Sequence, residues 1–128
     1  MTQAFVDANV FVRFLMIDDP EKQQRSAALF TRVEQGELQL TTATSTIAEV
    51  VYVLHSRRLY NKSASEVVQM LIPLIELRGL RLYLRELLMK ALAIFNFTQM
   101  SFGDAMIAAM FDKPDQVLYS FDTTQAKN

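Results

Sequence analysis

Four acidic residues lie within or directly after apolar segments of the sequence. Charged side chains are uncommon in segments that enter the core, so these four are candidates for a function. Asp7 and Asp122 each directly follow a short apolar run. Glu49 and Asp104 lie early in the apolar stretches STIAEVVYVL and SFGDAMIAAM. Two carboxylates about 5 Å apart repel each other by roughly 3 kcal/mol at an effective dielectric constant near 20. If folding brings these acids together, a cation or shared protons must compensate their charge.

The remaining composition narrows the kind of cation. The chain has no cysteine and a single histidine, His55, which excludes thiolate zinc sites and iron-sulfur clusters and makes a Ser-His-Asp triad hard to build. Hard carboxylate oxygens suit Mg²⁺ or Mn²⁺, and Mg²⁺ usually keeps water ligands that can be presented to a phosphate. The acids therefore favour metal-assisted hydrolysis of a phosphodiester bond.

Each acid also has a structural interpretation that needs no metal. These interpretations are a helix cap at Asp7 and Asn9, capping boxes that pair Glu49 with Thr46 and Asp104 with Ser101, and a turn at Asp122. Four independent caps would have no reason to point towards one side of the fold. The joint pattern therefore favours a shared metal site.

The elements that would position these acids alternate between short apolar runs and amphipathic helices. We expect strands near 4–6, 38–40, 80–83 and 117–120, and helices over 20–35, 44–58, 63–77, 84–97 and 101–112. This alternation is typical of an α/β fold with a parallel sheet. Ligands of such sheets bind beyond the carboxyl ends of the strands, so Asp7 and Asp122 are expected at one edge.

Local signals support the helix assignments. Asp19 followed by Pro20 is a typical helix start, and Ser63 with Glu66 forms a capping-box pattern. Between residues 44 and 58 the apolar side chains recur at the spacing of one buried helix face, as expected for a core helix.

Length and composition predict one domain over residues 1–128. The chain is 51% hydrophobic and has only three glycines and three prolines, and it contains neither a linker nor an internal repeat. Thirteen Lys and Arg residues against fourteen Asp and Glu residues give a net charge of -1, so nucleic-acid binding would depend on a local basic patch. The candidates for phosphate contacts are Arg13, Arg57, Arg58 and Lys62.

The first residues are unlike a secretory signal. Asp7 and Arg13 interrupt the apolar stretch, and no basic region precedes it. No apolar run approaches the roughly 18 residues of a membrane span. We therefore expect a cytoplasmic protein with no membrane contact.

Four segments in this order resemble PIN-domain nucleases, and specifically the VapC-like toxins of prokaryotic type II toxin-antitoxin pairs: VDANVFVRFL, TSTIAEVVYVL, SFGDAMIAAM and VLYSFD. The resemblance covers nearly the whole chain. It implies a three-layer α/β/α PIN-like fold around a central parallel sheet of about four strands. The implied activity is Mg²⁺- or Mn²⁺-dependent endoribonuclease cleavage, with a metal-bound water as the nucleophile.

The resemblance also assigns roles to the acids, all four of which become catalytic candidates. Asp7 and Asp104 match the acids that bind the principal ion. Glu49 and Asp122 match the second and fourth acids, with Asp122 as a further metal ligand, and Asn9 matches a polar residue that supports the first. The implied partners are an RNA substrate, a second copy of the chain in a homodimer and a cognate antitoxin.

Two features depart from the family pattern. Thr124 stands where family members often have a further acid, which puts a second metal ion in doubt. The chain stops at Asn128, where family members commonly continue into a last short strand, so either this edge of the sheet is missing or the sequence is truncated.

Two other functions compete with the ribonuclease toxin. A catalytically weak module of the same architecture would only bind RNA or hold a structural ion. A phosphoacceptor receiver domain fits the length but not the residues, because Asp7 is followed by Ala8 and Asn9 rather than by a second acid. His55 is expected at the surface or in a partner contact rather than as a catalytic base.

Overall fold

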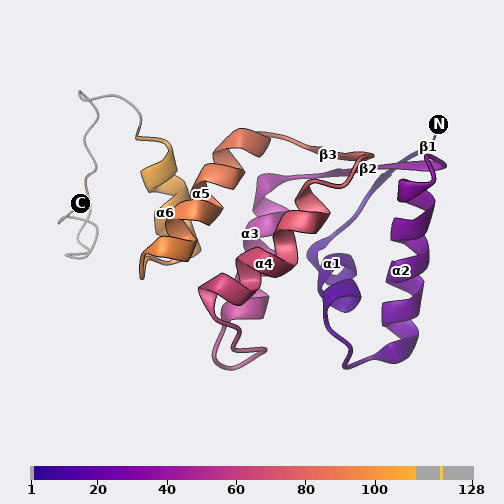
Figure 1. Ribbon diagram of the computed structural model, residues 1–128, viewed down its shortest axis with the longest axis horizontal. Helices are drawn as coiled ribbons and strands as arrows, with labels where there is room; N and C mark the ends of the chain where they lie inside the picture. Colours follow the sequence, from indigo (N-terminus) through magenta and orange to yellow (C-terminus); the bar gives the residue numbers. More distant parts are fainter. Residues whose placement is uncertain (1, 112–118, 120–128) are drawn as a thin grey trace. The chain divides into compact units, whose positions relative to one another are not determined.

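The computed structural model describes residues 2–111 and 119. They belong to two compact units, Met1–Arg85 and Glu86–Asn128, which we describe separately. The elements in chain order are β1 (Thr2–Phe5), α1 (Ala8–Leu15), α2 (Pro20–Glu34), β2 (Leu38–Thr42), α3 (Thr44–His55), α4 (Ala64–Ile75), β3 (Leu80–Leu82), α5 (Arg85–Phe97) and α6 (Phe102–Ala109) (Figure 1).

The first unit contains a parallel sheet with the strand order β1-β2-β3. Its register places Phe5 beside Thr41 and Thr42 beside Leu82. The predicted α/β class with a parallel sheet is thereby confirmed, and three of the expected strands are present. Helices α1 to α4 lie on one side of these strands (Figure 1).

The two faces of the sheet differ in burial. Leu38, Leu40 and Thr42 alternate along β2 and are all buried. On the opposite face of β1, Phe5 is 79% exposed. Because successive strand residues point to opposite faces, helices α1 to α4 cover the face of this sheet that carries Leu38, Leu40 and Thr42.

The helices of the first unit pack through aromatic and aliphatic side chains. The ring of Phe30 in α2 lies 5.7 Å from that of Phe11 and 4.7 Å from that of Phe14, both in α1. The predicted apolar stripe of α3 is buried as expected; it consists of Ile47, Val50, Val51 and Leu54. This packing holds α1 between α2 and α3.

The predicted helix starts are confirmed. The Asp19 side chain accepts a hydrogen bond from the Lys22 backbone N–H at 3.2 Å and caps α2, with Pro20 as its first residue. Ser63 and Glu66 form both hydrogen bonds of the capping box of α4, each 3.1 Å long.

The predicted helix ends are less accurate. The sequence pattern continues α3 to residue 58, but the helix ends at His55, because Ser56 adopts an extended conformation and turns follow. Asn61 completes this reversal with a positive φ of 52°. Helix α4 likewise ends at Ile75, before residue 77, and the chain turns through Gly79 into β3.

The second unit contains α5 and α6. Phe95 and Phe102 meet in an edge-to-face contact with ring centroids 5.7 Å apart. Helix α6 begins after Ser101, as predicted, but ends at Ala109. The predicted strand over 117–120 lies outside the described residues except for Tyr119. Across residues 2–111 and 119, none of the helices has the length and apolar character needed to cross a membrane.

Candidate active site

Asp7 lies at the junction between β1 and α1. Its Oδ1 accepts a hydrogen bond from the Asn9 backbone N–H at 3.0 Å, which makes Asp7 the N-cap of α1. The structural interpretation of this residue is therefore correct. It does not exclude a chemical role, since an ionised carboxylate has about four lone-pair sites and this cap uses one. The side chain is exposed at the end of the strand.

Glu49 lies in the second turn of α3, which begins two residues after β2. Strands β1 and β2 are neighbours and parallel, so α1 and α3 start from the same edge of the sheet, and the two helices pack against each other. Asp7 and Glu49 therefore belong to helices that start at this carboxyl edge. The exposed Glu49 is about 7.5 Å along the axis from the start of α3, at 1.5 Å per residue.

The predicted capping box of Glu49 with Thr46 is wrong. The N-cap of α3 is Ala43, which makes no side-chain capping bond, and Thr46 already lies inside the first turn. A residue at the position of Glu49 is too far along the helix to reach the N-cap backbone. Glu49 therefore takes no part in the cap of α3.

Asp104 belongs to the second unit, where it is the third residue of α6. Its backbone N–H donates a hydrogen bond to Ser101 Oγ at 3.1 Å, so the predicted Ser101 cap is present. The geometry that relates Asp104 to the acids of the first unit stays a prediction. Asp122 and Thr124 lie outside the described residues.

The donor chemistry at the carboxyl edge of the sheet fits Mg²⁺ or Mn²⁺. Asp7 and Glu49 offer hard carboxylate oxygens. Thr42, the last residue of β2, is only 5% exposed, and its Oγ1 has no hydrogen-bond partner among the described residues. Burying a hydroxyl without a hydrogen-bond partner costs about 1–3 kcal/mol of stability. A polar ligand bound at this edge would supply that partner. Residues 2–111 and 119 contain no group of three acidic or histidine side chains gathered as metal ligands.

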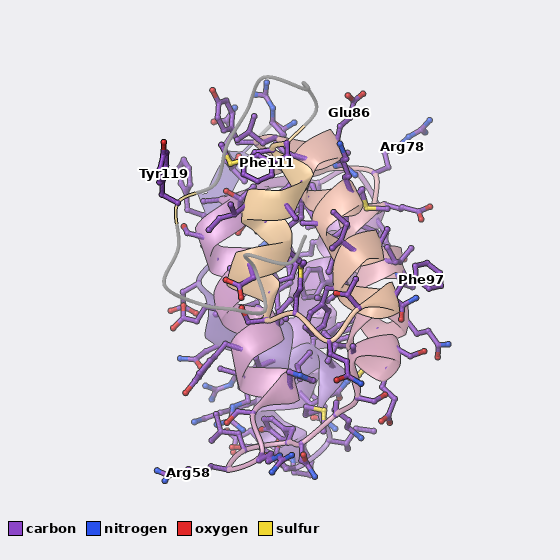
Figure 2. The ribbon with its side chains drawn as sticks, turned by 90° about the vertical axis from the view of Figure 1, so that its left-hand side faces the viewer. Arg58, Arg78, Glu86, Phe97, Phe111 and Tyr119 are labelled. Carbon is purple, nitrogen blue, oxygen red and sulfur yellow. The ribbon has the colours of Figure 1, made fainter. Side chains whose placement is uncertain are left out.

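Three of the predicted phosphate-binding residues lie far from this edge. Arg57, Arg58 and Lys62 follow the carboxyl end of α3, and this helix is about 18 Å long at 1.5 Å per residue. Figure 2 shows the Arg58 side chain projecting outward from this segment. His55 belongs to the same region, where its Nδ1 donates to the Lys62 carbonyl oxygen over 2.8 Å.

Arg13 is the predicted phosphate-binding residue that lies on α1, the helix that Asp7 caps. It occupies the last turn of α1 and its Nη1 donates to Asp18 Oδ1 at 3.3 Å. Beside it the structure places two cations that the sequence analysis missed, Lys22 and Arg25 of α2. The only sequence signal for this pair is their spacing of three residues on one helix face.

The sequence matches a family of known proteins. A sequence model of the PIN domain matches residues 3–121. Searches of curated proteins and of solved structures each gave no match. Proteins with a PIN domain are typically metal-dependent nucleases. With β1, β2 and α3 arranged as the motifs predicted and nearly the whole chain matched, the protein belongs to the PIN-domain family.

Proposed function

We propose that this protein is a divalent-metal-dependent endoribonuclease. The observation that carries the proposal is the PIN-domain match over residues 3–121. The arrangement of the first unit supports it, because Asp7 and Glu49 belong to helices that start at one edge of a parallel sheet. The substrate bond is an RNA phosphodiester, and the reaction is hydrolysis.

The residues of this chain have distinct roles in the proposed reaction. A bound Mg²⁺ or Mn²⁺ would supply an acidified water and positive charge near the phosphate oxygens. Asp7 would hold the ion, and its side chain is kept in place by the hydrogen bond from the Asn9 backbone N–H. Asp104 and Asp122 would be further ligands of the ion, and either Glu49 or Asp122 would accept the proton of the attacking water.

The finer proposal is a toxin of a prokaryotic toxin-antitoxin pair that acts in the cytoplasm as a homodimer. It rests on the similarity of the four motifs to VapC-like toxins. Exposed apolar side chains offer surface for an antitoxin, since Tyr52 is 63% exposed and Leu59 is 55% exposed. If this proposal holds, expression of the protein should arrest growth. Co-expression of the protein encoded by the neighbouring gene should relieve that arrest.

A cleavage assay with matched variants tests the proposed nuclease. Asn caps helices about as well as Asp, so Asp7→Asn removes the charge and keeps the cap of α1. We expect at least about a hundredfold loss of RNA cleavage, the size of losing one electrostatic stabiliser. Asp104→Asn should lose as much cleavage activity. The substitution leaves the backbone N–H of residue 104 bonded to Ser101, so the cap of α6 is kept. Glu37→Gln is the control, since Glu37 precedes β2 at the opposite edge.

The assay uses structured and unstructured RNA with Mg²⁺, with Mn²⁺ and with a chelator. The proposal expects cleavage by the native protein that stops on chelation. Equal cleavage by native protein and Asp7→Asn would identify a contaminating nuclease and overturn the proposal. Retained RNA affinity without metal-dependent products would instead support the RNA-binding module.

A further inference from the structure

A depression of about 360 Å³ lies between α1 and α2 in the first unit. Its lining consists of Asn9, Val10, Arg13, Lys22, Arg25 and Ser26. It begins next to Asp7, because the backbone N–H of Asn9 is the group that the Asp7 carboxylate binds at 3.0 Å. We call these six residues the α1–α2 groove.

The packing of the two helices produces this groove. On α1, Asn9 and Arg13 are four residues apart, and on α2, Lys22 lies three residues before Arg25, so each pair shares a helix face. The contact of Phe30 with the α1 aromatic rings holds α2 against α1. Two rows of polar and cationic side chains therefore face one channel.

Acidic neighbours pair with each cation but do not line the groove. Arg25 contacts Glu21 at 3.0 Å with both side chains 77% exposed, and Lys22 is 3.9 Å from Asp19 and 59% exposed. Ion pairs this exposed contribute little and are weakened by salt, so a phosphate can compete for both cations.

Arg13 is less exposed than the other two cations. Its side chain is 32% exposed, and it donates through Nη1 to Asp18. A guanidinium carries five N–H donors, so this contact leaves donors for a second anion. Arg13 is thus a positioned cation between the capped start of α1 and the more exposed cations of α2.

The lining chemistry is that of a nucleic-acid backbone site. Contacts to phosphate and sugar come mainly from Arg, Lys, Ser and Asn side chains, which are the polar residue types present in the groove. Ser26 is 7% exposed and forms part of its wall. We propose that the α1–α2 groove binds the backbone phosphates of the RNA strand beside the bond cleaved at Asp7. This inference rests on the proposed ribonuclease function and assigns binding roles to Lys22 and Arg25.

Binding in the presence of chelator tests the groove without cleavage. The variant is Lys22→Gln with Arg25→Gln, and the measurement is the fluorescence anisotropy of labelled single-stranded RNA titrated at several salt concentrations. We expect at least about a tenfold loss of affinity. The slope of log affinity against log salt should fall by about 1.4, since each lost contact to a single strand accounts for about 0.7.

The control removes the same charge elsewhere in the first unit. Arg78→Gln with Arg81→Gln changes two exposed arginines near β3, and Figure 2 shows Arg78 pointing outward. This control should bind RNA as the native protein does. Arg25→Lys, which keeps the charge, should retain most of the affinity lost in Arg25→Gln.

Further arms identify the ligand. The affinity of the groove variant for oligouridine and for oligoadenosine should fall by the same factor, because backbone contacts carry no sequence information. Inorganic phosphate at the same phosphate concentration should not displace RNA; if it does, the groove is a site for free phosphate and the inference fails.

The outcomes separate this inference from the proposed function. If the native protein cleaves RNA and the groove variant binds RNA with native affinity and salt slope, only the groove inference is overturned. A native protein that neither binds nor cleaves RNA overturns both.

Discussion

At the start of α1, the Asp7 carboxylate accepts the Asn9 backbone N–H. This hydrogen bond fixes the side chain at the strand end before any ligand arrives, which lowers the cost of ordering it when an ion binds. Glu49 differs, because it is exposed and plays no part in the cap of α3. The fold therefore orients the Asp7 side chain, whereas the Glu49 side chain lies exposed on the surface of α3.

The buried hydroxyl of Thr42 leads to a prediction about stability. Thr42→Val replaces the unpartnered Oγ1 with a methyl group of similar size. Without metal, we expect the free energy of unfolding to stay the same or rise by about 1 kcal/mol, because no hydrogen bond is lost and less polar surface is buried. Urea denaturation with Thr41→Val as the control measures this. A loss above about 1 kcal/mol would mean that the hydroxyl has a partner.

At the scale of elements, the turn between α4 and β3 fixes the edge strand of the sheet. Gly79 has a φ of +99°, and its carbonyl oxygen accepts the Leu40 N–H at 2.9 Å. Arg85 reinforces this connection, since its guanidinium donates to the carbonyl oxygens of Ile75 and Leu80. The end of α4 is thereby tied to β3, and the parallel register with β2 follows.

Gly36 and Gly79 both have positive φ, but the space around them differs. A Cβ at Gly79 would lie 2.8 Å from Val33 Cγ1, whereas a Cβ at Gly36, with a φ of +79°, would meet nothing within 4 Å. Gly36→Ala should cost about 1–2 kcal/mol of unfolding free energy through backbone strain alone. Gly79→Ala should cost at least about 1 kcal/mol more, because buried Val33 must move. Equal losses in urea denaturation would contradict the close contact.

At the scale of the whole first unit, one link joins segments that are distant in sequence. The Tyr60 hydroxyl donates to Asp18 Oδ2 at 2.6 Å, connecting the α3–α4 segment to the α1–α2 segment. This hydrogen bond lowers the pKa of Asp18 below its ordinary value of 3.8 and raises the pKa of Tyr60 above 10.0. Arg13 contacts the same carboxylate, so the link also supports one wall of the α1–α2 groove.

This link predicts a pH window for stability. The lowered pKa of Asp18 means that its contribution is present above pH 3.8 and is lost as pH falls through the folded pKa. The raised pKa of Tyr60 means that its contribution is present below pH 10.0 and is lost as pH rises through the folded pKa.

Tyr60→Phe should therefore be less stable than the native protein between these limits, and the difference should shrink at both extremes. Thermal unfolding from pH 3 to pH 11 measures it, with Tyr52→Phe, whose side chain is 63% exposed, as the control. A stability difference between the native protein and Tyr60→Phe that does not change with pH would contradict a contribution from the ionisable pair of Tyr60 and Asp18.

Local chemistry determined much of this protein. The caps at Asp19 and Ser63, the apolar stripe of α3 and the alternation of strands and helices were all predictable, because caps and periodicity depend on residues within a few positions of one another. The same logic placed Asp7 after β1 and Glu49 early in α3. Helix ends were less predictable, since α3 stops where the chain reverses at Ser56 and Asn61 rather than where helix-forming residues run out.

Tertiary structure alone decided which distant groups became neighbours. Lys22 and Arg25 meet Asn9 and Arg13 only because α2 packs on α1. Tyr60 reaches Asp18 across 42 positions of sequence, because α3 packs on α1. Contacts of this kind depend on the packing angle and register of whole helices, which are set by the summed burial of many apolar side chains rather than by any short pattern.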